Sequence, residues 1–334
     1  MLEAYRRTGA DPPFGDLRGW HGVGLEGYYW RFAHGPSGRA VAVILAVSRD
    51  AAGAPWGLVA LAGHPGGFVR SAMVPTATAA PHGLDVRLTD GGRTVLAAGE
   101  DRLLVDLGTD ARLDVALDGL RGWPRRVFGA LGPAQVLPGL SQYWHPYLLG
   151  GRARGSAVLG DSGYELDGFA AYAEKNWGEG GMPPAWWWGQ ASSFEREDVC
   201  VAFAGGRARV GPVRVNAGAL VVALGGSVLR VVRPLQPLRV ELGDGTWRLA
   251  GHTGWARATA CSSASPPMSR SNIPMTSHSE RRRSAAARST GATRASLTSA
   301  LRPAPSGSIH VPKRTRTVPG SFQDVKASGP SSRA

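Results

Sequence analysis

Arg112-Leu-Asp-Val-Ala-Leu117 alternates polar and apolar residues along the chain, apart from the small Ala116. Successive side chains of a β-strand point to opposite faces of a sheet. An extended chain here therefore places Leu113, Val115 and Leu117 on one face and the charged residues on the other. The pattern predicts a strand with one face in a hydrophobic core and the other in water.

Short apolar or alternating segments of this kind recur between residues 27 and 251, separated by glycine, proline and aspartate. Such spacing is typical of antiparallel strands joined by turns. The sequence therefore predicts an all-β protein. The clearest expected strands are 28–32, 40–47, 58–61, 84–88, 94–97, 103–107, 112–117, 157–159, 186–191, 199–203, 220–224, 228–232, 238–242 and 247–250.

A proline- and glycine-rich stretch, residues 121–142, interrupts this pattern. Within it, residues 123–131 have a proline near their start and are followed by Gly132-Pro133, which predicts a short helix. We expect an N-terminal β half at residues 1–120, a bridge at 121–142 and a second β half at 143–256. Two barrel-like halves are the preferred architecture, and a single large sandwich is the alternative.

The net charge of +13 for 334 residues is concentrated at the end of the chain. Residues 257–334 contain thirteen lysines and arginines against two acidic residues. Residues 1–256 contain the other 25 basic and 23 acidic residues, a net charge of +2. The folded part therefore lacks the basic surface that binding of nucleic acid requires, and we expect no nucleic-acid partner.

Residues 257–334 also contain a single aromatic residue and show neither strand nor helix periodicity. They offer too little apolar surface to offset the entropy of ordering. We expect a disordered basic tail without stable strands, which leaves an open sheet edge near Trp247. Its origin is either a native basic extension or translation of a GC-rich gene out of frame.

The chain has two cysteines, Cys200 and Cys261, and its longest apolar run is residues 40–47. Two cysteines and scattered histidines provide neither a disulfide framework nor a metal site. The apolar run is far shorter than the ~20 residues of a membrane helix. Residues 22–27 match a dinucleotide-binding glycine pattern, but a strand instead of a helix follows. We expect a soluble cytoplasmic protein without metal or organic cofactor.

Several motifs follow one another in the middle of the chain: Ser141-Gln-Tyr-Trp-His-Pro-Tyr147, Gly163-Tyr-Glu-Leu-Asp-Gly-Phe169 and Tyr172-Ala-Glu-Lys-Asn-Trp-Gly178. Pro183-Pro-Ala-Trp-Trp-Trp-Gly-Gln190 and the N-terminal His21-Gly-Val-Gly-Leu-Glu-Gly-Tyr-Tyr-Trp30 accompany them. Over about residues 5–255 these segments resemble the tocopherol cyclase family, whose signature is the Ala-Glu-Lys-Asn-Trp-Gly string.

The resemblance implies a lipocalin-like fold, with two antiparallel β-barrel or sandwich halves around apolar cavities. It also implies a redox-neutral isomerisation, the closure of a chromanol ring in a prenylated hydroquinone or related isoprenoid. This chemistry requires an acid to protonate the alkene, a polar group to orient the phenol, and aromatic faces to stabilise the tertiary carbocation. Members of the family continue through further C-terminal strands where the basic tail lies here, which favours the frameshift explanation.

Residues 172–177, if extended, place Tyr172, Glu174 and Asn176 on one face and Lys175 and Trp177 on the other. Glu174 is the candidate general acid, with a pKa raised by apolar surroundings, and Asn176 is the candidate for orienting the phenol. The candidate substrate-binding residues are Tyr172, Trp177, Trp186, Trp188, Gln190, Glu26, Tyr28, Trp30 and His145.

Each assignment has a structural alternative. Glu174 is either the acid or half of an ion pair with Lys175 or a nearby arginine. Glu26 is either a substitute acid or a carboxylate at a barrel rim. Residues 186–188 either line a cavity or pack in a core. His145 is either a catalyst or a hydrogen-bonded loop histidine. For the whole protein, the alternative to an enzyme is a non-catalytic carrier of a prenyl lipid. In both cases the ligand is a small apolar molecule, acquired through peripheral contact with a membrane.

Overall fold

The computed structural model describes residues 25–49, 52–79, 83–136, 140–178, 185–192, 194, 196–243, 246–253, 257–264, 293–298, 308–309 and 314–317. The start of the quoted motif at His21, the residue Pro183 and most of the basic tail lie outside these ranges. The described residues are predominantly β-structure, and none of their helices is long and apolar enough to cross a membrane.

The first sheet is antiparallel, and strands from both sides of residues 121–142 contribute to it. Its order is β4-β3-β2-β1-β13-β11-β9-β8-β7-β6-β5, with β10 beside β13 and β12 beside β11. The strands are β1 (Leu25–His34), β2 (Arg39–Arg49), β3 (Pro55–His64), β4 (Phe68–Val74), β5 (Thr76–Ala79), β6 (Asp85–Asp90), β7 (Arg93–Gly99), β8 (Arg102–Asp106), β9 (Ala111–Asp118), β10 (Gln142–Leu148), β11 (Arg152–Leu159), β12 (Ser162–Glu165) and β13 (Ala170–Gly178).

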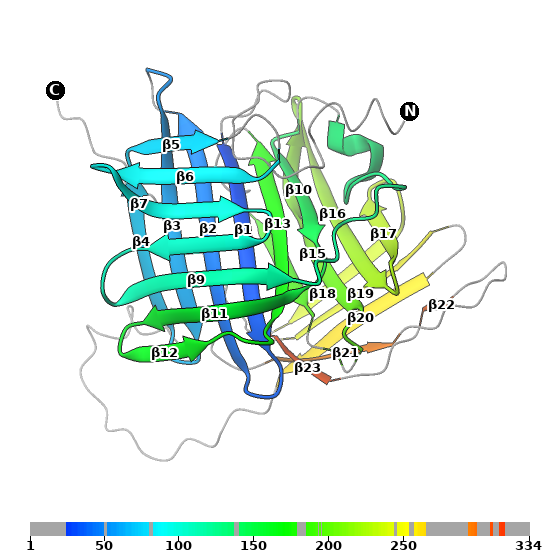
Figure 1. Ribbon diagram of the computed structural model, residues 1–334. Coiled ribbons are helices and arrows are strands. Elements are labelled where there is room, and N and C mark those ends of the chain that lie inside the picture. Colours follow the sequence, from blue (N-terminus) through cyan, green and yellow to red (C-terminus); the bar gives the residue numbers. More distant parts are fainter. Residues whose placement is uncertain are drawn as a thin grey trace, which may run out of the picture.

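This sheet folds over on itself, so that β5–β9, β11 and β12 run across β1–β4 (Figure 1). Strands β11 and β13 share a single register pair, Arg152 with Ala170, where the two layers meet. The first core fills the space between the layers and includes Trp30, Phe32 and Leu88. It contains most of the buried hydrophobic residues of the first sheet.

Strand β9 confirms the alternation read from the sequence. Leu113, Val115 and Leu117 are buried in the first core, whereas Arg112 and Asp114 are exposed. All the other expected strands also fall within, or overlap closely with, observed strands. The prediction of an all-β fold is therefore confirmed.

Two further sheets form the rest of the described structure. The second contains β14 (Trp186–Ala191), β15 (Val199–Val210), β16 (Val213–Leu224) and β17 (Ser227–Arg233). The third contains β18 (Leu238–Gly243), β19 (Thr246–His252), β20 (Arg257–Ala264), β21 (Thr293–Thr298), β22 (Ser308–Ile309) and β23 (Arg314–Thr317). A second core, with Phe203, Leu220 and Leu249, lies between them. These sheets therefore pack as a sandwich.

A third core joins the first and second sheets. Trp144 of β10 and Tyr172 of β13 pack there against Ala202 of β15 and Val221 of β16. Strand β13 is consequently covered on both faces, by the first core on one side and the third core on the other. This double burial is what places polar residues of β13 inside the protein.

Neither half closes into a barrel among the described strands, since no sheet order returns to its first strand. The strands therefore form packed open sheets, as in the sandwich version of the two predicted halves, and not closed barrels. The chain passes from the first sheet to the second after β13, because residues 142–178 still belong to the first sheet. Division of the chain into folding units at residues 121–142 stays a prediction.

The bridge differs from the expected helix at residues 123–131. The backbone N–H of Trp123 donates to the carbonyl oxygen of Tyr147, which holds the start of this segment extended beside the end of β10. A short 3-10 helix forms only afterwards, over Gly132–Val136. Backbone pairing with a distant strand thus overrides the local helix signal.

The expectation that no strand forms beyond residue 257 is wrong. Strand β20 pairs with β19, including Trp247 with Ser262, so the third sheet does not end at β19. Ala258 and Ala260 are buried in the second core. The signal was missed because alanine between arginine, threonine and cysteine gives only a weak apolar alternation. The remaining tail residues, apart from β21–β23, lie outside the described ranges.

Candidate functional site

The two faces of β13 carry different side chains, as its alternation predicts. Tyr172 belongs to the third core and Glu174 makes its hydrogen bonds to residues of that core, whereas Ala173 belongs to the first core. Neighbouring strands supply the surroundings, because Tyr29 of β1 is the register partner of Glu174 and Trp144 of β10 is the partner of Asn176. The candidate site therefore lies at the junction of the first and second sheets.

Glu174 is 3% exposed and its carboxyl group accepts four side-chain hydrogen bonds. The Tyr172 hydroxyl donates to Oε2 at 2.6 Å, and the indole N–H groups of Trp144 and Trp188 each donate to the same oxygen at 2.9 Å. Asn176 Nδ2 donates to Oε1 at 3.3 Å. Strands β10, β13 and β14 thus converge on one buried carboxyl group.

The two carboxyl oxygens of Glu174 differ in the number of donors that they face. Oε2 already accepts three hydrogen bonds, whereas Oε1 accepts one longer bond. A protonated carboxyl carries one O–H donor and keeps acceptor capacity on the other oxygen. The proton of the neutral acid therefore belongs on Oε1, the side occupied by Asn176.

Burial raises the pKa of Glu174 above its ordinary value of 4.5, because the charged form loses solvation. The hydrogen bonds from Tyr172, Trp144, Trp188 and Asn176 act in the opposite direction without cancelling the effect of burial. The site thus combines a carboxyl group that holds its proton more tightly than in water with donors that stabilise the carboxylate once the proton leaves.

The raised pKa predicts a pH-dependent stability difference between the wild type and Glu174→Gln. A folded-state pKa above the unfolded value gives stability that is fully present below the unfolded pKa and lost as pH rises through the folded pKa. Glutamine stays neutral, so the unfolding free energy of Glu174→Gln should rise relative to the wild type across that window. Urea unfolding at a series of pH values measures this difference. Glu165→Gln on the exposed face of β12 is the control, and a difference that does not change with pH would contradict the assignment.

Two aromatic rings lie next to Glu174: Trp188 donates a hydrogen bond to its Oε2, and Tyr29 is its register partner on β1. Trp188 and Tyr29 meet edge to face with ring centroids 5.1 Å apart. Asn176, Trp188 and Tyr29 are partly exposed, whereas Glu174 itself is buried. These three residues are therefore the more exposed neighbours of the buried carboxyl group.

The candidates on β1 do not join this site. Trp30 belongs to the first core together with Tyr28, on the other face of the sheet from Glu174. The Tyr28 hydroxyl donates to Glu26 Oε1 at 2.8 Å, and Lys175 Nζ lies 3.2 Å from the same oxygen. The expectation that Glu26, Tyr28 and Trp30 line one cavity with residues 186–190 is therefore not met.

The pairing of Lys175 with Glu26 also answers whether Glu174 is half of an ion pair. Lys175 pairs with Glu26 and also lies 4.6 Å over the Trp177 ring, which stacks on Tyr143. Glu174 forms no ion pair with any described residue. Lys175 and Trp177 thus lie on the face predicted for them, and Glu174 is not the partner of Lys175.

The remaining candidates make no side-chain hydrogen bond to Glu174. Gln190, two residues after Trp188, accepts a hydrogen bond from Arg31 Nη1 at 2.9 Å. Trp186 is half-buried at the start of β14. His145 is buried in β10, where its Nδ1 accepts from the backbone N–H of Ala130 at 3.3 Å. His145 is therefore not a loop residue, and it makes no hydrogen bond to Glu174.

Sequence reasoning missed Trp144, Tyr29 and Arg31. Trp144 lies inside a quoted motif, directly before the candidate His145. On an extended strand these two neighbours point to opposite faces, so choosing His145 left out the face that carries Trp144. Tyr29 and Arg31 occupy the face of β1 opposite to Tyr28 and Trp30. Both faces of β1 pack against a core, and Tyr29, the register partner of Glu174, lies on the face that the sequence analysis did not select.

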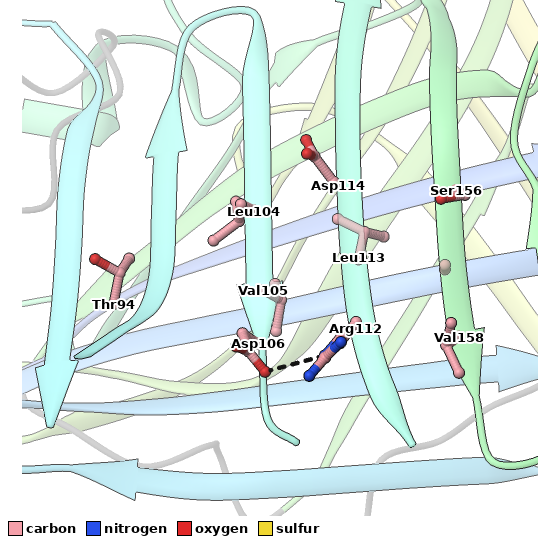
Figure 2. Close-up of a pocket in the computed structure, with 10 residues that line it drawn as sticks. Thr94, Leu104, Val105, Asp106, Arg112, Leu113, Asp114, Ser156 and Val158 are labelled. Carbon is pink, nitrogen blue, oxygen red and sulfur yellow. Dashed lines mark ion pairs between the residues drawn. The ribbon is translucent and has the colours of Figure 1, made fainter. Parts of the chain in front are cut away.

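A separate pocket of about 440 Å³ lies on the outer face of β8, β9 and β11 (Figure 2). Arg112 and Asp106 form an ion pair at 3.5 Å beside it, and Asp114 and Val158 are exposed there. The first core separates this face from β13. The pocket is therefore a solvated surface depression apart from the Glu174 site.

Fold and site together define an all-β protein of packed antiparallel sheets with a hydrogen-bonded acid buried where two of the sheets meet. The chain belongs to the tocopherol cyclase-like family, whose sequence model matches residues 100–281. The resemblance read from the motifs is thus confirmed. The match continues past residue 255, so the expectation that the likeness stops there is wrong.

The chain is similar to two solved structures at low sequence identity. The "putative AttH" (NE1406) of Nitrosomonas europaea is 12% identical, with 86% of this chain and 90% of that chain covered and a TM-score of 0.46. Kievitone hydratase of Nectria haematococca is 9% identical, with 88% of each chain covered and a TM-score of 0.43. The search of curated proteins found no match.

Proposed function

We propose that the protein is an acid-catalysed cyclase that closes a chromanol-type ring in a prenylated hydroquinone or related isoprenoid. The observation that carries the proposal is Glu174, a buried carboxyl group with a raised pKa and one oxygen that is not crowded by donors. Membership of the tocopherol cyclase-like family supports a cyclase-type reaction. The reaction is an isomerisation and needs no oxidant or reductant.

The proposed step begins with transfer of the Glu174 Oε1 proton to the less substituted carbon of the prenyl double bond. A C–H bond forms and leaves a tertiary carbocation. The phenol oxygen then attacks this carbon, a C–O bond forms, and the phenol proton passes to the Glu174 carboxylate. All atoms of the substrate remain in the product, and the acid is regenerated.

Asn176 is proposed to orient the attacking phenol. Its Nδ2 donates to Glu174 Oε1, and its Oδ1 makes no hydrogen bond to the described residues. A carbonyl oxygen in that position can accept the phenol O–H, so that one amide holds both the acid and the nucleophile. The two reacting groups are then aligned before the proton moves.

The surrounding rings provide electrostatic stabilisation in both halves of the step. The indole N–H groups of Trp144 and Trp188 and the hydroxyl of Tyr172 point at Oε2, where negative charge develops as the proton leaves. The faces of Trp188 and Tyr29 are suited to the carbocation, because a cation is attracted to an aromatic face. We further propose that the prenyl substrate is taken up through peripheral contact with a membrane.

The proposal is tested by incubation with a prenylated hydroquinone in D₂O. The expected product is an isomer that carries one deuterium on the carbon next to the new ether carbon, because the acid exchanges its proton with solvent. Mass spectrometry and chromatography measure both properties. Tight binding without any isomer would instead identify a non-catalytic carrier of a prenyl lipid, and a product with incorporated oxygen would overturn redox-neutral ring closure.

A further inference from the structure

Arg31 is a buried cation on the same face of β1 as Tyr29. Its side chain is 6% exposed, and Nη1 donates to Gln190 Oε1 at 2.9 Å. Gln190 in turn lies beside the Cys200 thiol, with Nε2 3.9 Å from Sγ. Strands β1, β14 and β15 thus bring these groups together between the first and second sheets.

The immediate partners of Arg31 carry no compensating negative charge. Arg31 forms no ion pair with any carboxylate of the described residues, and its one hydrogen bond is to a neutral amide. Burial raises the pKa of Tyr29 and Tyr172 and raises that of Cys200 to about 12, so these groups stay neutral near pH 7. Burial also lowers the pKa of Arg31, yet a guanidinium keeps its proton in proteins.

A buried charge without a partner is unfavourable, and a guanidinium presents five N–H donors in a planar fork. One of these donors is used in the structure. Groups of this kind in a binding site are suited to carboxylates, which accept two parallel hydrogen bonds. The missing counter-charge can therefore be supplied by a ligand.

The register between β1 and β13 places Arg31 close to the acid. Tyr29 pairs with Glu174 and Arg31 pairs with Tyr172, so the two pairs are two residues apart on the same face. That separation is about 7 Å along a strand. It is comparable with the span of a substituted aromatic ring, which sets the size of a ligand that would contact both Arg31 and Glu174.

We propose that Arg31 binds a carboxylate on the aromatic ring of the substrate, which makes prenylated aromatic acids the preferred substrate class. This inference rests on the proposed function for the identity of the prenylated ring. In this arrangement Gln190 fixes the orientation of the guanidinium. The carboxylate lies at Arg31 while the prenyl double bond lies at Glu174.

The test uses two unreactive ligands, a hydroxybenzoate that carries a saturated prenyl chain and its methyl ester. Quenching of tryptophan fluorescence reports binding without any need for turnover. The acid should bind the wild type about ten- to a hundredfold more tightly than the ester, as expected for a hydrogen-bonded charge pair. Equal affinity for the two ligands would overturn the proposal.

Variants separate a role in binding from a role in folding. Arg31→Gln should abolish the preference for the acid, Arg31→Lys should retain part of it, and the control Arg39→Gln, a partly exposed arginine on β2, should retain all of it. If Arg31→Gln fails to fold, the wild-type comparison still decides the matter. Preference for the acid without ring closure of the unsaturated acid would overturn the proposed function alone. Ring closure without that preference would overturn the role of Arg31 alone.

Discussion

Glu174→Gln is expected to lower the rate of ring closure by about 10² or more, as loss of a general acid does. The amide preserves the shape of the side chain and an acceptor for Tyr172, Trp144 and Trp188, but it has no proton of comparable acidity to give to an alkene. Affinity for an unreactive ligand should change little, because the substitution removes an interaction needed in the transition state. Single-turnover rates and fluorescence titration measure the two quantities separately.

One control changes another carboxylate of the chain, and a second keeps a carboxylate at position 174. Glu165→Gln removes an exposed carboxylate from β12 and should leave the rate unchanged. Glu174→Asp keeps the acid but withdraws it by one methylene from its three donors on Oε2, so an intermediate rate is expected. An unchanged rate for Glu174→Gln would remove Glu174 as the proton donor. Glu26 would be a poor replacement, because its carboxylate already pairs with Lys175 on the other face.

The raised pKa fixes the direction in which the rate depends on pH. A general acid acts only while protonated, so activity should be lost as pH rises through the pKa of Glu174, which lies above its ordinary value. The same protonation also governs the stability difference described above. Agreement between the two pH profiles would tie the chemistry and the stability to one carboxyl group.

The alternation of single strands was predictable, but their neighbours were not. The residues of β9 and β13 fall on the faces that their sequences indicate, and Glu174 with Asn176 share one of them. The pairing of β1 with β13 joins segments far apart in the chain. Alternation along a strand shows which residues share a face, but it does not show which core that face contacts. Tyr28 and Trp30 were therefore assigned to the wrong side.

Small or polar residues account for the other differences between the predicted and the observed structure. Ala258 and Ala260 of β20 fill the second core with little apolar surface, so their strand escaped notice. Arg31 was overlooked because a charged residue in an aromatic strand is normally expected to face water. Buried charge of this kind depends on tertiary contacts, such as the one to Gln190, which composition does not reveal.

Lys175→Met is expected to lower the unfolding free energy by about 3–5 kcal/mol, the usual effect of breaking a buried ion pair from one side. Lys175 and Glu26 are 1% and 2% exposed, with Nζ 3.2 Å from Oε1. Removal of the ammonium leaves the Glu26 carboxylate buried with the Tyr28 hydroxyl as a remaining donor. It also removes the cation from the face of the Trp177 ring.

The double variant Lys175→Met with Glu26→Gln separates the cost of a stranded charge from the value of the pair. Glutamine is neutral and still accepts from Tyr28, so most of the lost stability should return. Arg102→Met provides the matched exposed comparison, because Arg102 pairs with Asp114 at 2.9 Å on the solvent side of β8 and β9. That change should cost at most about 1 kcal/mol. Urea unfolding of all three variants decides the point: if Lys175→Met costs no more than Arg102→Met, the buried pair does not hold β1 and β13 together.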